Sequence, residues 1–246
     1  MGANVRALTR AALRRWPLPE PGDDADKEDR GQVLVVAGSL EIPGAAILAG
    51  EAALRAGAGK LVIAAPSGVA QGLALAVPES RVIGLAHNSD GGIDVASACE
   101  LLAPLAAGVR AAVIGPGMQH EPCCVSLVDA LLPAFSQVPV VLDALAMCAA
   151  RDGRAFTQPV ILTPHAGEMA SLCGMTKEAV AADPLTAVRM AADRFNACVA
   201  PKGAQTHICL PGESAWRFDG GTPGLATSGS GGTLAGLVGG LAARGV

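Results

Sequence analysis

The 246-residue sequence predicts an α/β fold, in which helices cover both faces of a mostly parallel sheet. Continuous apolar runs rich in β-branched residues alternate along the chain with segments of helical periodicity. Hydrophobic residues make up 51% of the chain and charged residues only 16%, which is enough apolar material for a large core. Aromatic residues make up 2%, so we expect small aliphatic side chains to fill that core.

The first expected strand, Gln32–Ala37, is a continuous apolar run of the kind found in strands that are buried on both faces. The helix after it ends at Gly57, which is typical of a helix C-terminus. All the expected strands are Gln32–Ala37, Lys60–Ala65, Arg81–Ile83, Ala111–Ile114, Val138–Asp143, Val160–Thr163, Ala197–Pro201 and His207–Leu210. The expected helices are Ala45–Ala56, Ser67–Leu75, Asp94–Leu105, Val125–Leu132, Glu168–Leu172, Leu185–Phe195 and Thr233–Arg244.

The N-terminal 30 residues differ from the rest of the chain. Residues 1–16 are rich in Arg and are predicted to form an amphipathic helix, and the acidic stretch Glu20–Arg30 is predicted to be a solvated loop. Residues 31–246 contain no internal repeat and no linker-like segment. We therefore expect one α/β domain over residues 31–246, preceded by an N-terminal helix and loop over residues 1–30.

Charge and composition argue against several classes of protein. The net charge is −4 and the basic residues are scattered, which disfavours nucleic acid as a partner. Residues 220–243 carry no charge, but Pro223 and a Gly/Ser cluster leave only about 11 helical residues there, too few to span a bilayer. The seven cysteines lack metal-ligand spacing and are interpreted as reduced, small apolar side chains. We expect a cytoplasmic protein without a membrane partner.

The strongest functional signal is the Gly-rich segment Thr227–Gly236 at the start of the last expected helix. Consecutive glycines let the backbone turn its N–H groups inward, and a helix N-terminus adds unpaired N–H groups and a positive dipole end. The segment is therefore predicted to hold phosphate. A flexible loop before a tightly packed helix is the alternative. Neither a dinucleotide fingerprint nor a Walker A motif is present.

Four further loops follow strand ends, where α/β sheets bind ligands. In Lys202–Thr206 the lysine could supply a point charge, although an ordinary exposed lysine fits as well. His165 and Glu168 lie three residues apart where a strand runs into a helix, and a structural histidine is the alternative there. The tight turn at residues 115–117 and the small-residue helix start at residues 42–46 leave room for a ligand.

Taken together and in this order, these segments resemble the ADP-dependent NAD(P)H-hydrate dehydratase family, a branch of the ribokinase-like superfamily. The resemblance begins at about residue 31 and continues to the end of the chain. The matching motifs are VLVVAGS at 33–39, PGAAILAGEAALRAGAG at 43–59, IGPG at 114–117, LTPHAGE at 162–168, KGAQT at 202–206 and SGSGGTLAG at 228–236. It implies a ribokinase-like three-layer sandwich with a mostly parallel central sheet.

The resemblance also implies an activity, which is repair of damaged nicotinamide cofactors. Such enzymes dehydrate the S form of hydrated NADH or NADPH with ADP, or ATP, as phosphoryl donor and with Mg²⁺. Hydroxide is a poor leaving group, so phosphorylation of the ring hydroxyl precedes elimination. A homo-oligomer is implied as well. A noncatalytic nucleotide-binding homologue and a kinase for a small alcohol are the alternatives.

Site residues follow from the matched motifs. The implied nucleotide-binding residues are Lys202, Gly203, Ala204, Gln205, Thr206 and Gly231. Gly229 and Ser230 are expected in the loop that holds the transferring phosphoryl group, and Ala46, Gly117 and His165 are expected to line the pocket for the hydrated cofactor. The ligands of the metal are left unassigned.

Three departures from the family pattern stand out. Ala166 replaces the usual Pro, and family members usually continue with further helices beyond the position of Val246. Gly232 occupies the position of the Asp that is taken to be the general base, and losing a general base costs about 10²–10⁴ in rate. We therefore expect impaired catalysis. The acids nearest the matched motifs in sequence are Asp143, Glu168 and Asp219.

Overall fold

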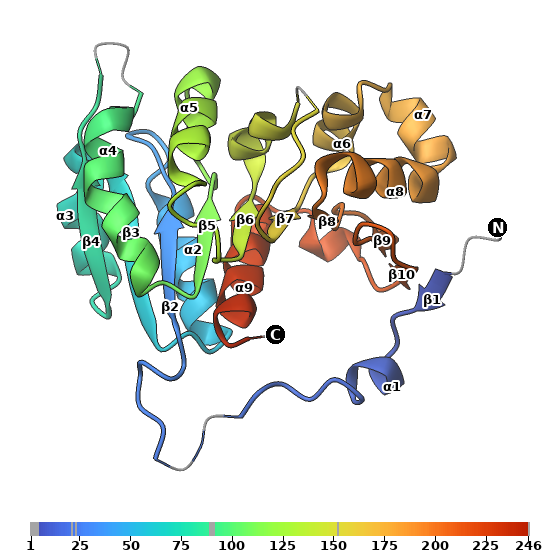
Figure 1. Cartoon of the computed structure of the whole chain (residues 1–246), viewed down its shortest axis with the longest axis horizontal. Helices are drawn as coiled ribbons and strands as arrows, with labels where there is room; N and C mark the ends of the chain where they lie inside the picture. The colour runs from blue at the N-terminus through green and yellow to red at the C-terminus, as the bar shows by residue number, and fades with distance from the viewer. Residues whose placement is uncertain (1–4, 21, 23, 89–91, 152, 246) are drawn as a thin grey trace.

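The structure is a computed structural model that describes residues 5–20, 22, 24–88, 92–151 and 153–245. A central sheet lies between two layers of helices (Figure 1). All strand pairs in this sheet are parallel, and the strand order is β4-β3-β2-β5-β6-β7-β8. The strands are β2 (Gln32–Val36), β3 (Lys60–Pro66), β4 (Ser80–Leu85), β5 (Ala111–Ile114), β6 (Val140–Leu142), β7 (Val160–Leu162) and β8 (Cys198–Val199). The predicted α/β fold class is confirmed.

Each face of the sheet has its own helical layer. One layer consists of α2 (Gly44–Arg55), α3 (Ser67–Ala76) and α9 (Ser230–Ala243). The other contains α4 (Val95–Leu102), α5 (Glu121–Leu131), α6 (Ala166–Cys173) and α8 (Pro184–Phe195), with α7 (Lys177–Ala182) packed against α6 and α8. Three short 3₁₀ helices are η1 (Ala103–Ala107), η2 (Ala144–Ala150) and η3 (Pro223–Leu225).

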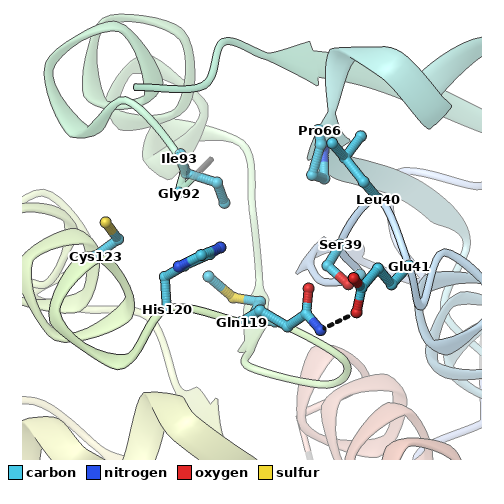
Figure 2. Close-up of a pocket in the computed structure, with 11 residues that line it drawn as sticks. Ser39, Leu40, Glu41, Pro66, Gly92, Ile93, Gln119, His120 and Cys123 are labelled. Carbon is cyan, nitrogen blue, oxygen red and sulfur yellow. Dashed lines mark hydrogen bonds between the residues drawn. The ribbon is translucent and has the colours of Figure 1, made fainter. Parts of the chain in front are cut away.

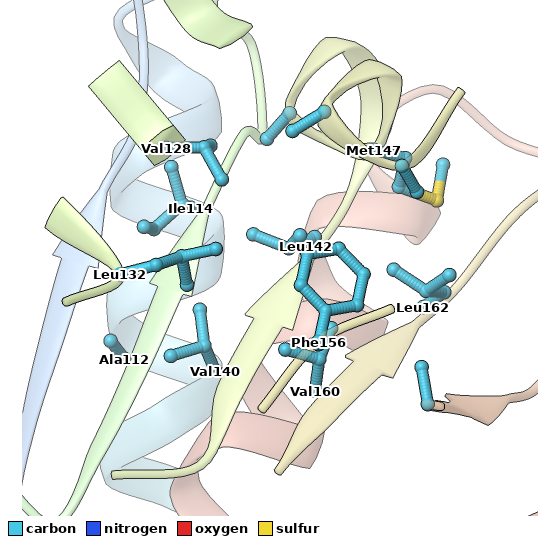
Figure 3. Packing of buried hydrophobic residues seen from close by; sticks show 14 of the residues in the cluster. Ala112, Ile114, Val128, Leu132, Val140, Leu142, Met147, Phe156, Val160 and Leu162 are labelled. Atoms are coloured by element: carbon cyan, nitrogen blue, oxygen red, sulfur yellow. The ribbon is translucent and has the colours of Figure 1, made fainter. Parts of the chain in front are cut away.

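Side-chain alternation along the strands builds a separate core on each face. In β2, Leu34 and Val36 join the core beneath α5 and α8, whereas Val33 and Val35 join the core beneath α2 and α9. Figure 3 shows the first of these cores, where Phe156 lies among aliphatic side chains from β5, β6 and β7. Both faces of each central strand are therefore buried, as the continuous apolar runs predicted.

The N-terminal segment corrects one prediction. The expected helix over residues 1–16 is replaced, in its described part, by the strand β1 (Val5–Ala7) and one helical turn, α1 (Arg10–Leu13). β1 pairs in parallel with β10 (Ala215–Phe218), which pairs with β9 (Thr206–Ile208) in a small three-stranded sheet. Backbone pairing with an available strand edge outweighs the weak helical preference of so short a segment.

Aromatic contacts hold this segment in place. The rings of Trp16 and Trp216 meet edge to face with centroids 4.7 Å apart, and the Arg6 guanidinium lies over the Trp216 ring. The segment therefore packs against the domain that follows it, and the division of the chain at residue 30 stays a prediction.

Other predicted boundaries shift by a few residues. α9 begins at Ser230, three residues before the predicted start, because Gly229 adopts a left-handed conformation (φ 84°) that starts the helix earlier. The strand expected at His207–Leu210 is β9, which begins one residue earlier and ends at Ile208. β10 and α7 were not predicted, since each is too short for a clear periodic pattern.

The structure also bears on the cysteines and on the apolar C-terminal segment. Cys124 and Cys209 are fully buried, the other five cysteines are half-buried, and all seven are free thiols. Burial raises the pKa of Cys124 to about 12, so this thiol stays protonated at neutral pH. Among the residues that the structure describes, no helix combines the length and the apolar character needed to cross a membrane.

We predict that Gly236→Ala destabilises the protein by about 1–3 kcal/mol, because the added methyl would overlap the carbonyl oxygen of Ala49 where α9 crosses α2. The matched control is Gly72→Ala in α3, where an added methyl meets open space and should stabilise the helix by about 0.5–1 kcal/mol. Urea unfolding of both variants measures the difference. Equal free energies of unfolding would contradict the close packing of α2 and α9.

Candidate functional site

Three neighbouring strands bring polar side chains to one edge of the sheet. Asp143 directly follows β6, Thr163 directly follows β7, and Lys202 follows β8 in the loop that leads to β9. The carboxyl ends of parallel strands meet at the same edge, so these residues lie together although up to 59 positions separate them in sequence. The N-terminus of α9 reaches the same place.

The Asp143 carboxylate is the buried centre of this cluster. Its side chain is only 5% exposed, and its Oδ1 accepts hydrogen bonds from Thr163 Oγ1 at 2.9 Å and from Lys202 Nζ at 2.7 Å. The Lys202 ammonium also lies 3.8 Å from Glu168 Oε2, so one cation is shared between two carboxylates. The Lys202 N–H donates to the carbonyl of Pro164 at 2.7 Å, which fixes the start of its loop.

The glycine turn at α9 lies against this ion pair. No side chain among those described caps α9, and Gly231 in its first turn places the positive end of the helix dipole beside the cluster. A methyl group at Gly231 would lie 3.4 Å from Lys202 Nζ and 3.9 Å from Asp143 Oδ2. The absence of a side chain at position 231 therefore leaves a space bounded by an ammonium, a carboxylate and a helix N-terminus.

Gly232 faces a different side of the same turn. A methyl group there would lie 3.3 Å from Pro116 Cβ and 3.9 Å from the carbonyl oxygen of Ala45. Gly117 follows in the same loop with φ 68°, and a side chain on it would overlap the Cβ of Ala45. Ala46 is fully buried. Ala46 is therefore enclosed by the protein, and the missing side chain of Gly117 lets its loop pack closely against the start of α2.

His165 and Glu168 form a reciprocal cap at the start of α6. His165 Nδ1 accepts from the N–H groups of Gly167 (3.0 Å) and Glu168 (3.3 Å), while Glu168 Oε2 accepts from the His165 N–H at 2.7 Å. A histidine in this role must keep Nδ1 unprotonated, which leaves Nε2 as the N–H donor. The imidazole remains 60% exposed, and its Nε2 lies 3.5 Å from Glu168 Oε1.

The loop after Lys202 is exposed, and the segment that follows β10 makes hydrogen bonds to it. Gly203, Ala204 and Gln205 are exposed, and Thr206 begins β9. The Gln205 amide donates to Asp219 Oδ1 at 2.7 Å, and the Gly221 N–H donates to the carbonyl of Ala204 at 3.1 Å. Of the predicted nucleotide residues, Lys202 is the one that lies beside Gly231 at the start of α9, where Gly229 and Ser230 begin the helix.

A second hollow lies beside Gly117, at the carboxyl ends of β2, β3 and β5. Figure 2 shows His120 and Cys123 on one side of this cavity, Ser39 with Glu41 on the other, and Gln119 between them. Its volume is about 140 Å³. The Gln119 amide donates to Glu41 Oε2 at 2.8 Å in the lining of this cavity. Sequence reasoning missed these side chains, and it missed Thr163 as the partner of Asp143.

The comparisons with known proteins identify the family to which the chain belongs. A family model described as NAD(P)H-hydrate dehydratase matches residues 33–245. The chain belongs to this family. It is 47% identical over 244 residues to the ADP-dependent (S)-NAD(P)H-hydrate dehydratase of Xanthomonas campestris, covering 99% of this chain and 82% of the relative.

Bifunctional relatives are longer. The bifunctional NAD(P)H-hydrate repair enzyme Nnr of Moorella thermoacetica is 40% identical over 247 residues, which cover 99% of this chain and 46% of the relative. The chain thus spans less than half of that protein. The family membership that the sequence motifs predicted is therefore confirmed.

Solved structures confirm the ribokinase-like fold. The ADP/ATP-dependent NAD(P)H-hydrate dehydratase of Bacillus subtilis, co-crystallised with ATP and Mg²⁺, superposes with a TM-score of 0.81 at 32% identity, covering 98% of this chain and 83% of the neighbour. A ribokinase-like superfamily protein of Enterococcus faecalis gives a TM-score of 0.83 at 24% identity, covering 98% and 80% of the two chains.

We predict that His165→Ala lowers the free energy of unfolding by about 1 kcal/mol, because the N–H groups of Gly167 and Glu168 lose their acceptor. His165→Asn is the matched control, since the asparagine oxygen is a good cap and should retain most of the stability. Chemical denaturation measures both variants. A loss in His165→Asn as large as that in His165→Ala would contradict the capping role.

Proposed function

We propose that this protein dehydrates the S form of hydrated NADH or NADPH and uses ADP as the phosphoryl donor. The observation that carries the proposal is the space at Gly231, bounded by the Lys202 ammonium and the N-terminus of α9. Such a space suits a phosphate group. The Xanthomonas campestris relative, at 47% identity, is named for this reaction, which supports the same substrate here.

The nucleotide fits the Lys202 side of the glycine turn. The Lys202 ammonium supplies a point charge for the phosphates, and residues 203–206 form an exposed loop beside it for the rest of the nucleotide. Gly229 and Ser230 begin the helix whose N–H groups face the transferring phosphoryl group. Gly231 allows the phosphate to approach closely, because any side chain there would contact the lysine.

Mg²⁺ accompanies nucleotide phosphates in phosphoryl transfer and neutralises the charge that develops on them. Proteins usually hold this ion through one or two carboxylates together with the phosphates themselves. The Asp143 and Glu168 carboxylates, which both lie within 4 Å of Lys202 Nζ, are suitable for that role. The Bacillus subtilis neighbour was co-crystallised with ATP and Mg²⁺, which supports either nucleotide as donor.

The hydrated cofactor fits the Pro116 side of the turn. The family resemblance assigns Ala46, Gly117 and His165 to this part of the site, where Gly117 packs against the start of α2 and His165 lies at the start of α6. The cavity in Figure 2 adjoins Gly117 and offers space for a further part of a dinucleotide. As the resemblance implies, we propose that the protein works as a homo-oligomer.

A second function, nucleotide binding without turnover, is favoured by one observation. Gly232 provides no carboxylate on the side of the turn that faces Pro116. The two functions are separated by incubating the protein with hydrated NADH, ADP and Mg²⁺ and following the return of the reduced nicotinamide absorbance. Turnover supports the dehydratase. Calorimetric binding of ADP without turnover supports the binding protein, and failure to bind ADP contradicts both.

We predict that Gly232→Asp raises the dehydration rate by about 10²–10⁴, because it introduces a carboxylate on the substrate side of the turn. Position 232 has room for the side chain, since only Pro116 Cβ comes closer than 3.4 Å to an added methyl. The control is Gly232→Asn, which has the same shape but cannot accept the proton in the same way. Steady-state kinetics distinguish them, and equal rates for both variants would contradict a role for the charge.

We predict that Lys202→Met weakens ADP binding by about tenfold to a hundredfold, because a charged hydrogen bond to phosphate contributes about 1.5–3 kcal/mol. Lys60→Met is the matched control, since Lys60 pairs with Glu28 at the amino end of β3, the opposite edge of the sheet. Isothermal titration calorimetry measures both. An unchanged dissociation constant in Lys202→Met would place the nucleotide elsewhere.

A further inference from the structure

The strands β6 and β7 end next to each other, and a buried polar residue follows each of them. Asp143 follows β6 and is 4% exposed, while Thr163 follows β7 and is fully buried. The proposed function uses Asp143 beside the nucleotide but gives Thr163 no role. A buried hydroxyl is costly unless it makes a hydrogen bond, so the partner of Thr163 indicates what this residue does.

The register of the two strands turns both side chains toward α9. Leu142 and Leu162 are paired, and both enter the core beneath α5 and α8. Because successive side chains along a strand point to opposite faces, Asp143 and Thr163 point to the face that α9 covers. The pairing continues to these residues, since the Thr163 N–H donates to the carbonyl of Leu142 at 3.4 Å. The hydroxyl and the carboxylate therefore meet beside the start of α9.

The Asp143 carboxylate needs an external contact to fix its orientation, because the last torsion of an aspartate side chain has a broad distribution. Two donors meet at its Oδ1, the Thr163 hydroxyl at 2.9 Å and the Lys202 ammonium at 2.7 Å. The threonine is β-branched and enclosed, so its hydroxyl is held rigidly. The lysine side chain is long, flexible and 23% exposed. Thr163 is therefore the fixed member of this group of three.

The position of the Lys202 ammonium depends on that carboxylate. A second carboxylate oxygen, Glu168 Oε2, lies 3.8 Å from Lys202 Nζ and accepts the His165 N–H at 2.7 Å. Because a lysine stem is flexible, the ammonium moves to whichever carboxylate is better placed. The hydrogen bond to Asp143 keeps Nζ beside Gly231, in the first turn of α9. A carboxylate free to rotate would no longer fix the ammonium there.

We propose that Thr163 is a positioning residue for nucleotide binding, whose hydroxyl holds the Asp143 carboxylate so that the Lys202 ammonium stays beside the start of α9. The inference rests on the placement of the nucleotide phosphates in the proposed function. An ammonium has three N–H donors, so Lys202 can bind phosphate while it donates to Asp143. Thr163 is fully buried and acts through Asp143, without touching the nucleotide itself.

The test is a double-mutant cycle in the full chain with Thr163→Val, Lys202→Met and the double variant, and its readout is ADP affinity by calorimetry without Mg²⁺. Thr163→Val removes the hydroxyl at nearly constant volume and should weaken ADP binding by about threefold to thirtyfold. In the Lys202→Met background the same change should cost less than about twofold, because no ammonium remains to be positioned. An equal loss in both backgrounds would overturn the proposal.

A conservative variant separates positioning from a structural role. Thr163→Ser retains the hydroxyl and should bind ADP within about twofold of the wild type, whereas Thr163→Ala should lose as much affinity as Thr163→Val. This pair also provides the comparison if Thr163→Val fails to fold. Urea unfolding is measured for each variant. Equal ADP affinities in Thr163→Ser and Thr163→Ala, with only stability changed between them, would show that the hydroxyl supports the fold alone and would contradict the inference.

Failure of the inference differs from failure of the proposed function, because ADP affinity is measured independently of turnover. If Thr163→Val weakens ADP binding only when Mg²⁺ is added, and equally in the Lys202→Met background, Thr163 acts on the metal ion, so the inference fails while the dehydratase function stands. If the cycle shows the expected coupling but hydrated NADH is not turned over, the inference stands and the dehydratase function fails. If the wild-type chain does not bind ADP, both fail.

Discussion

The close approach of α9 to α2 and to the sheet is the constraint on which the candidate site depends. Two glycines of α9 contact the backbone of α2, Gly236 at Ala49 and Gly240 at Ala53. A third, Gly239, contacts the side chain of Val113 in β5. Side chains at these glycines would push α9 outward. Because the helix cannot move without opening both contacts, its N-terminus stays beside the carboxyl ends of β5 and β6. The packing of apolar surfaces thus determines where the phosphate-binding turn lies.

Electrostatics at that turn are balanced between attraction and repulsion of anions. The α9 N-terminus and the Lys202 ammonium attract phosphate, whereas Asp143 and Glu168 repel it. The two carboxylates compensate the charge of the ammonium, and Asp143 also accepts a hydrogen bond from it. A nucleotide brings phosphates close to these carboxylates. Because a phosphate-bound Mg²⁺ adds positive charge that offsets their repulsion, a nucleotide with Mg²⁺ suits this arrangement better than a bare phosphate does.

The order of strands and helices was predictable because each central element carries a strong local pattern. Gln32–Ala37 and Lys60–Ala65 are continuous apolar runs, and both form central strands of the sheet. The N-terminal segment was not predictable, since its partner β10 lies more than 200 residues away and no local pattern reports such a pairing. The left-handed start of α9 at Gly229 was missed for a related reason, because glycine permits several conformations and only packing selects one.

The sequence by itself determined the fold class, the family resemblance and the loops that gather at one edge of the sheet, because these follow from periodicity and from motifs of adjacent residues. The sequence also showed that Gly232 occupies the position where the family resemblance leads us to expect an aspartate. Only the tertiary structure decided which acid faces the glycine turn. Asp143, Thr163 and Lys202 follow three different strands, and their hydrogen bonds exist only once those strands are in register. The distances between side chains from separate strands depend on how the strands and helices pack, so sequence spacing alone could not rank Asp143 above Glu168 and Asp219.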